Sequence, residues 1–138
     1  RYTIPIGTGA VVRPGSDVTL VAYGSMVRES LRAAETLASA GVSAEVIDLQ
    51  TVSPWDADLV TASAERTGRV VAVAEGHRTA GMASEIAATV QERCLYRLLA
   101  PVERVTGLDT VVPLKRAEQY YVPDAARIAA AAQRTLEA

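Results

Sequence analysis

The sequence predicts a three-layer α/β/α sandwich, and the clearest evidence is a strand–helix–strand unit near its start. Val18–Tyr23 is short and largely apolar, which is typical of a strand buried on both faces in the middle of a sheet. Ala44–Leu49 has the same character. Tight links between strand, helix and strand make a right-handed crossover, so the two strands should be parallel. The helix between them would bury side chains at helical spacing: Val27, Leu31, Ala34 and Ala38.

Residues 1–14 are expected to be a linker with an edge strand, leading into a domain of residues 15–138. Proline and glycine interrupt the linker, and only Ala10–Arg13 is suited to a short strand. Because the chain starts inside a linker, we expect it to be a piece of a longer protein. After the first buried strand, Ser25 is expected to cap the helix and Gly41 to end it.

A second helix and a third strand are expected after this unit. Ser53 is the predicted N-cap, with Pro54 as the first helical residue and Asp56 as a favourable negative charge in the first turn. This helix should end at Gly68. Arg69–Glu75 is then predicted to be a third parallel strand, because it is again a short apolar run.

The rest of the chain predicts two helices and one strand. The loop Gly76–Gly81 leads into a helix at about Met82–Tyr96, and Pro101–Thr106 is a last short strand. Residues 107–122 have no clear period. Pro123 is expected to open a final helix. Its apolar face would be formed by Ala125, Ile128, Ala129, Ala132 and Leu136.

Composition limits the possible partners. The chain has 138 residues, 49% hydrophobic and 22% charged, which fits one globular domain with a sizeable core. Its net charge of -2 gives no attraction to nucleic acid or to an anionic membrane, and no apolar run approaches the ~20 residues of a spanning helix. Cys94 is the single cysteine, so no internal disulfide is expected, and a reducing cytoplasm is the expected location.

The loop around the only histidine is a candidate anion site. Ser25, His77, Arg78 and Gly81 would follow the carboxyl ends of parallel strands, where ligands usually bind in such sheets. The start of the next helix offers backbone N–H groups, and the arginine adds positive charge. The alternative is that His77 is an ordinary loop residue, bonded to neighbouring backbone or buried at a subunit contact.

Other reactive side chains have structural explanations. Asp48, Asp56 and Asp58 could be read as a carboxylate cluster, but a helix start and solvent exposure explain the last two. Cys94 falls on an apolar helix face, and Trp55 is expected to cover the core. No dinucleotide fingerprint, phosphate-binding loop or nucleophile triad is present. The sequence therefore predicts no catalytic, cofactor-binding or metal-binding residue in this chain.

Several stretches together resemble the C-terminal domain of the transketolase superfamily. The stretches at 75–81, 100–110 and 118–123 favour one subfamily: the beta subunit of the dehydrogenase component of 2-oxoacid dehydrogenase complexes, of the pyruvate or branched-chain type. One departure is Gln50, where that family usually has arginine. The matching stretches are DVTLVAYGSM at 17–26, AEVIDL at 44–49, SPWD at 53–56, EGHRTAG at 75–81, APVERVTGLDT at 100–110, and Glu118 with YVP at 121–123.

The resemblance implies a mixed five-stranded sheet whose first strand is an antiparallel edge strand. It also implies that the full enzyme uses thiamine diphosphate and magnesium to decarboxylate a 2-oxoacid, and then transfers the acyl group to a lipoyl arm. In the family, these cofactors bind between an alpha subunit and the N-terminal domain of the beta subunit. The diphosphate motif of the family ends in asparagines, and this chain has none. No cofactor is therefore expected in this domain, which should be inactive alone.

The resemblance also implies which partners the domain binds. These are a second beta subunit, an alpha subunit and the basic peripheral subunit-binding domain of the acyltransferase component. The docking groups of relatives correspond here to Glu103 and, if it is the terminus, to the carboxylate of Ala138. Acidic groups at such a contact would speed docking and fix its register. The alternative for Glu103 is an ordinary solvent-facing charge on a strand.

Two further functions remain open at the level of sequence. One is a small regulatory module that binds an anion or a nucleotide at the candidate anion site. The other is the C-terminal domain of a transketolase or of a deoxyxylulose-phosphate synthase. The sequence upstream of Arg1 would distinguish the second of these from a 2-oxoacid dehydrogenase.

Overall fold

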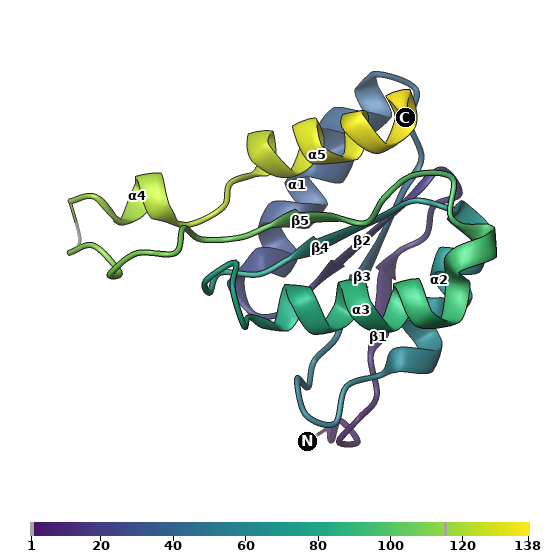
Figure 1. The fold of residues 1–138 in the computed structure, drawn as a ribbon, viewed down its shortest axis with the longest axis horizontal. Helices are drawn as coiled ribbons and strands as arrows, with labels where there is room; N and C mark the ends of the chain where they lie inside the picture. The colour runs from purple at the N-terminus through teal and green to yellow at the C-terminus, as the bar shows by residue number, and fades with distance from the viewer. Residues whose placement is uncertain (1, 115) are drawn as a thin grey trace.

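The computed structural model describes residues 2–114 and 116–138. It contains a five-stranded sheet with helices on both faces (Figure 1). In chain order the elements are β1 Ala10–Arg13, β2 Val18–Ala22, α1 Ser25–Ser39, β3 Ala44–Asp48, α2 Ala57–Thr67, β4 Val70–Val73, α3 Met82–Cys94, the 3-10 turn η1 Leu95–Arg97, β5 Glu103–Val105, α4 Glu118–Tyr121 and α5 Ala125–Glu137.

The sheet has the order β1-β3-β2-β4-β5, and only β1 runs antiparallel to its neighbour. The central strand is β2, where Leu20 lies opposite Val46 of β3 and Val71 of β4. Every residue of β2 is buried, as the sequence predicts for a strand covered on both faces. The predicted α/β/α sandwich and its antiparallel edge strand are therefore confirmed.

The core consists of two hydrophobic clusters, one on each face of the sheet. Alternate residues of a strand point to opposite faces, so Leu20 belongs to one cluster and Val21 to the other. The first cluster contains Met26 of α1 and Ile128 of α5, and the second contains residues of α2 and α3 such as Ile86. Figure 1 shows these two helix pairs on opposite sides of the sheet.

Helix α2 begins later than the sequence suggests. Ser53 is not its N-cap and Pro54 is not its first residue, because the helix starts at Ala57 and the Ser53–Pro54 peptide bond is cis. Asp56 is the N-cap instead, and its carboxylate accepts hydrogen bonds from the Leu59 N–H at 3.0 Å and from the Gly9 N–H at 2.9 Å. One aspartate therefore caps the helix and also fixes the linker.

The prediction that Ser25 caps α1 is also wrong. Gly24 occupies the N-cap position, and no side chain caps this helix. The Ser25 hydroxyl instead donates to Glu75 at 2.6 Å, across the carboxyl ends of β2 and β4. At the other end of the chain, α5 starts after Pro123, with Asp124 accepting from the Arg127 N–H at 2.8 Å.

Residues 107–114 and 116–122 extend away from the sheet, and we call them the arm. Figure 1 shows the arm projecting to one side, with the short helix α4 near its far end. The absence of a clear period in the sequence fits this irregular course. Within the described residues, no helix has the length and apolar character needed to cross a bilayer.

Candidate functional site

The loop between β4 and α3 holds most of the candidate anion site. His77 is exposed, its Nε2 lies 2.8 Å from the carbonyl oxygen of Thr110, and its ring meets Tyr121 edge to face at 6.2 Å between centroids. These contacts join the loop to the arm. They are of the kind expected for a loop histidine bonded to neighbouring backbone, which was the alternative interpretation of this residue.

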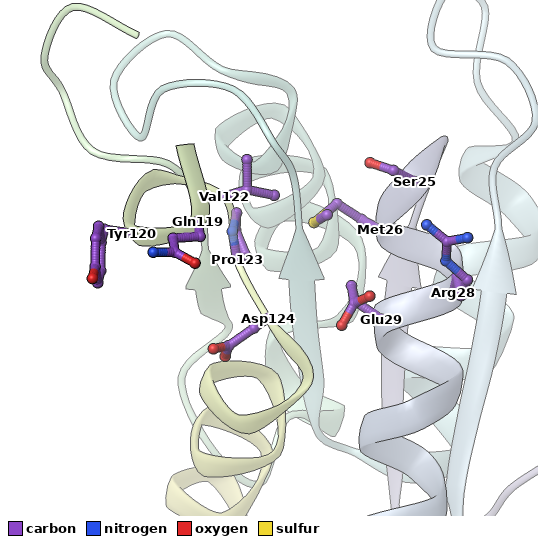
Figure 2. Close-up of a pocket in the computed structure, with 9 residues that line it drawn as sticks. All are labelled: Ser25, Met26, Arg28, Glu29, Gln119, Tyr120, Val122, Pro123 and Asp124. Atoms are coloured by element: carbon purple, nitrogen blue, oxygen red, sulfur yellow. The ribbon is translucent and has the colours of Figure 1, made fainter. Parts of the chain in front are cut away.

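Ser25 forms a hydrogen bond with an acidic side chain. Its hydroxyl donates to the exposed carboxylate of Glu75, which also helps to raise the pKa of Tyr23, although burial of the phenol is the larger cause. Ser25 lines an open pocket of about 600 Å³ between the start of α1 and the start of α5. Figure 2 shows Arg28 and Glu29 on one side of this pocket and Asp124 on the other, so its charges are mixed.

Gly81 packs tightly against the loop itself. A Cβ atom at this position would overlap the carbonyl oxygen of His77, so the loop folds closely onto the start of α3. The four candidate residues line different cavities: Ser25 faces the pocket of Figure 2, Gly81 a second, His77 a third and Arg78 a fourth. A single anion held by all four is therefore not the arrangement that this geometry favours.

Asp109 ties the same loop to the base of the arm. Its carboxylate accepts from the Thr79 N–H at 2.9 Å and from the Thr79 hydroxyl at 2.6 Å. These hydrogen bonds, with smaller contributions from other groups, lower the pKa of Asp109. A carboxyl group held ionised in this way has no proton to donate at neutral pH, so its role here is to position the loop.

Glu103, the candidate docking residue, is paired within the chain. Arg134 of α5 donates to both of its carboxylate oxygens, at 3.2 and 3.0 Å. The hydrogen bond from Arg134 is the main cause of the lowered pKa of Glu103, and burial offsets part of the effect. Arg134 lies one helical turn before Ala138, so the fold brings the two predicted docking groups to the same end of the molecule.

The remaining acidic and sulfur groups have structural partners. Asp48 accepts from the Gln50 N–H at 3.0 Å, and Asp58, almost fully exposed, pairs with Arg93 at 2.9 Å. Cys94 is buried with a raised pKa, chiefly because of that burial, and Trp55 packs against the second hydrophobic cluster. Among residues 2–114 and 116–138, no group of three or more histidine, cysteine, aspartate or glutamate side chains is arranged to hold a metal ion.

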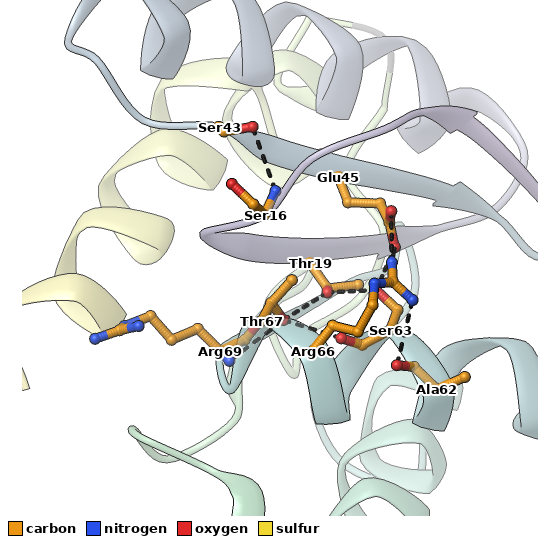
Figure 3. Close-up of polar contacts among 9 residues, drawn as sticks. All are labelled: Ser16, Thr19, Ser43, Glu45, Ala62, Ser63, Arg66, Thr67 and Arg69. Atoms are coloured by element: carbon orange, nitrogen blue, oxygen red, sulfur yellow. Dashed lines mark hydrogen bonds and ion pairs between the residues drawn. The ribbon is translucent and has the colours of Figure 1, made fainter.

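Two polar groupings were not predicted from the sequence. One joins β3 to α2, where the buried Glu45 accepts from Ser63 and from Arg66 (Figure 3). The other is a set of arginines beside β5 that surrounds a cavity of about 440 Å³. The only local signal for the second is the seven-residue spacing of Arg127 and Arg134, which places both on one face of α5.

Comparison with known families identifies this fold. The family model described as the transketolase C-terminal domain matches residues 7–128, which is most of the chain. The chain belongs to the transketolase C-terminal domain family. The resemblance inferred from the sequence motifs is thereby confirmed, including the mixed sheet with its antiparallel first strand.

The chain is also similar to named proteins, and two of them have the same name. The chain is 47% identical over 137 residues to the pyruvate dehydrogenase E1 component subunit beta of Staphylococcus epidermidis RP62A. It is 44% identical over 137 residues to the protein of the same name from Bacillus subtilis 168. Each alignment covers 99% of this chain but 42% of the relative, so the chain spans about two fifths of the length of these relatives.

A solved structure in the family has the same architecture. It is described as a split gene transketolase, inactive beta4 tetramer, and it superimposes with a TM-score of 0.81 at 32% sequence identity. The match covers 99% of this chain and 43% of the other. The similarity therefore extends over the whole transketolase C-terminal domain, and the remainder of each longer relative has no counterpart in these residues.

Proposed function

We propose that this chain is the C-terminal domain of the beta subunit of a thiamine-diphosphate-dependent 2-oxoacid dehydrogenase, and that the substrate of the enzyme is pyruvate. The single observation that carries the proposal is the 47% identity over 137 residues to a pyruvate dehydrogenase E1 component subunit beta. A branched-chain substrate was the other possibility raised by the motifs. The names of the relatives favour pyruvate over it.

In this proposal the domain holds subunits together and does not carry the chemistry. Thiamine diphosphate would supply the carbanion chemistry for decarboxylation, with magnesium bound to its diphosphate. The side chains here do not suit that cofactor, since residues 2–114 and 116–138 contain no cluster of metal ligands and the sequence has no asparagine. The cofactor would therefore bind to other parts of the enzyme.

The arm is the proposed contact with a second beta subunit. Val111, Leu114 and Tyr120 are 88%, 89% and 75% exposed, which is unusual for large apolar side chains on a monomer. Residues at the start of the chain are also apolar and exposed. We propose that they contact the rest of the beta subunit or the alpha subunit. The proposed enzyme is cytoplasmic, in keeping with one buried, unpaired cysteine.

The proposed docking surface for the acyltransferase is the end of the molecule that carries Glu103 and the last turn of α5. The peripheral subunit-binding domain of the acyltransferase is basic in this family, so its cations would compete with Arg134 for Glu103. Because Glu103 already has a partner, docking would exchange one ion pair for another, and its net gain would be smaller than for a free carboxylate.

This competition gives a direct test. The subunit-binding domain is titrated into the purified chain by isothermal calorimetry at two salt concentrations. We expect Glu103→Lys to weaken binding by at least about tenfold and to flatten its salt dependence, because an attractive charge becomes repulsive. Arg134→Ala should preserve or strengthen binding, since it frees the carboxylate. Glu92→Lys is the matched control, because it makes the same charge change at an exposed position of α3.

Two results would contradict the docking role. One is unchanged affinity and salt dependence in Glu103→Lys. The other is an equal loss in Glu92→Lys, because that would reflect net charge and not a defined contact.

A second candidate function is the C-terminal domain of a transketolase or of a deoxyxylulose-phosphate synthase. The observation in its favour is the 32% identity to a split gene transketolase over nearly the whole chain. The coding sequence immediately upstream of Arg1 distinguishes the two. An N-terminal domain of the dehydrogenase beta-subunit type would support our proposal, and one of the transketolase type would overturn it.

A further inference from the structure

We propose that this chain binds a small phosphate-bearing anion in the cavity beside β5, which we call the arginine cavity. Its volume is about 440 Å³, and it lies between the outer edge of the sheet and α5. The site is distinct from the candidate anion site at Ser25 and His77, with which it shares only Arg78. The charged residues that line it are Arg78, Glu103, Arg104, Arg127 and Arg134.

The position of the arginines follows from β5 being an edge strand. The Val105 carbonyl accepts from the Ala74 N–H at 3.0 Å, so by alternation the carbonyls of Arg104 and Thr106 point to the free edge. Arg78 donates to the first of these carbonyls at 3.2 Å, and Arg127 donates to the second at 2.8 Å. The exposed edge is therefore covered by guanidinium groups.

These contacts satisfy hydrogen bonds but leave charge unbalanced. Within the described residues, Arg134 pairs with Glu103, whereas Arg78, Arg104 and Arg127 have no carboxylate within ion-pair distance. Four positive charges and one negative charge leave the cavity with a net charge of +3. Like charges gathered in this way repel one another, and an anion with several charges would relieve that repulsion.

The guanidinium groups are also held in place before any ligand arrives. Arg104 donates to the Ser84 hydroxyl at 2.7 Å and to the Arg78 carbonyl at 3.3 Å, and Ser84 donates to the same carbonyl at 2.9 Å. Each guanidinium has five N–H donors, and the observed contacts use one or two of them. Donors that are fixed and still free reduce the ordering cost of binding.

A phosphate group is the ligand chemistry that fits this arrangement. Arginine pairs with phosphate through forked hydrogen bonds, and the tetrahedral oxygens of phosphate can meet donors that converge from different elements. A monocarboxylate carries one charge and would leave most of the positive charge uncompensated. The competing explanation is that the arginines only prevent other strands from pairing with the edge, which predicts no saturable binding.

The test uses inorganic pyrophosphate as the probe, titrated into the purified chain by isothermal calorimetry at low salt. We expect one saturable site. Arg78→Gln and Arg127→Gln should each weaken binding by about tenfold, because each removes a charge-assisted hydrogen bond. Arg93→Gln is the matched control, since Arg93 lies on α3 and pairs with Asp58 of α2. Inorganic phosphate and ADP, run in parallel, distinguish a free phosphate site from a phosphate-ester site.

Glu103→Gln provides a test whose expected result, tighter binding, cannot be caused by loss of folding. Among the described residues that line the cavity, Glu103 supplies the one carboxylate, so pyrophosphate should bind the variant several-fold more tightly. The same variant should weaken docking of the basic subunit-binding domain, so this inference and the proposed function can fail separately. Absence of saturable binding in a chain with a cooperative thermal transition would overturn the arginine cavity as a ligand site, as would equal weakening in Arg93→Gln.

Discussion

At the scale of single residues, Gly15 is a position where two stretches of backbone approach each other very closely. A Cβ built there would lie 2.7 Å from the carbonyl oxygen of Ala44, and still closer to the Ala44 carbonyl carbon and the Glu45 nitrogen. The backbone between Ala44 and Glu45 is part of β3 and has little freedom to move aside. This position therefore requires glycine for space, where β1 passes into β2.

We expect Gly15→Ala to lower the free energy of unfolding by about 1–3 kcal/mol, because the added methyl group overpacks fixed backbone. Gly76→Ala is the matched control, since no atom lies within 4 Å of its built Cβ and its φ is not positive. Urea unfolding followed by circular dichroism measures both. Equal stability of the two variants would mean that β3 can shift without cost.

At the scale of elements, β3 and α2 are joined by a buried polar network. Glu45 is 3% exposed and accepts from Arg66 through both oxygens at 2.7 Å, as well as from the Ser63 hydroxyl. Figure 3 shows Thr19 of β2 extending this network to Thr67 at the end of α2. A buried carboxylate is tolerated here because its oxygens have hydrogen-bond partners.

Loss of Arg66 should therefore cost more than loss of a surface arginine. We expect Arg66→Ala to reduce the free energy of unfolding by about 1–3 kcal/mol, because it leaves a buried carboxylate with an uncompensated charge. Arg93→Ala, which breaks the exposed pair with Asp58, should reduce the free energy of unfolding by only about 0–1 kcal/mol. Chemical denaturation at neutral pH compares the two. Equal losses would show that the burial of Glu45 has no energetic consequence.

At the scale of the whole molecule, the arm is the feature that the compact body does not explain. It contributes few buried side chains, chiefly Tyr121 at 4% exposure and the partly buried Val122, while Leu108, Val111, Val112, Leu114 and Tyr120 are exposed. Packing within its own chain therefore contributes little stabilisation to this segment. A second copy of the chain would bury this surface, in agreement with the assembly role that we propose.

Self-association should therefore depend on the arm. We expect the chain to form dimers, and Val111→Asp combined with Leu114→Asp to weaken dimerisation by at least about tenfold, since each buried aliphatic side chain contributes about 1.5–3 kcal/mol. Sedimentation velocity over a range of concentrations measures this. Tyr96→Asp is the matched control, because Tyr96 is 97% exposed but lies in η1. A chain that remains monomeric at high concentration would contradict the proposed contact.

Much of the fold could be read from local pattern, whereas most of the site could not. The strands at 18–22 and 44–48 were predicted, as 18–23 and 44–49, because a strand covered on both faces is mostly apolar. The start of α2 was misplaced because Ser53 and Asp56 are both good caps, and the deciding contact comes from Gly9. The candidate anion residues were adjacent in sequence or topology, yet in the structure they line different cavities.

The sequence by itself determined the sandwich, the family and the absence of a cofactor motif, because periodicity, turn residues and short motifs are local properties of the chain. Only the tertiary structure decided which polar groups meet. Glu45 finds Ser63 and Arg66 across 18 and 21 positions, and Glu103 finds Arg134 across 31. Such pairs form because the crossovers bring distant elements together, and no spacing in the sequence encodes the final distance between their charges.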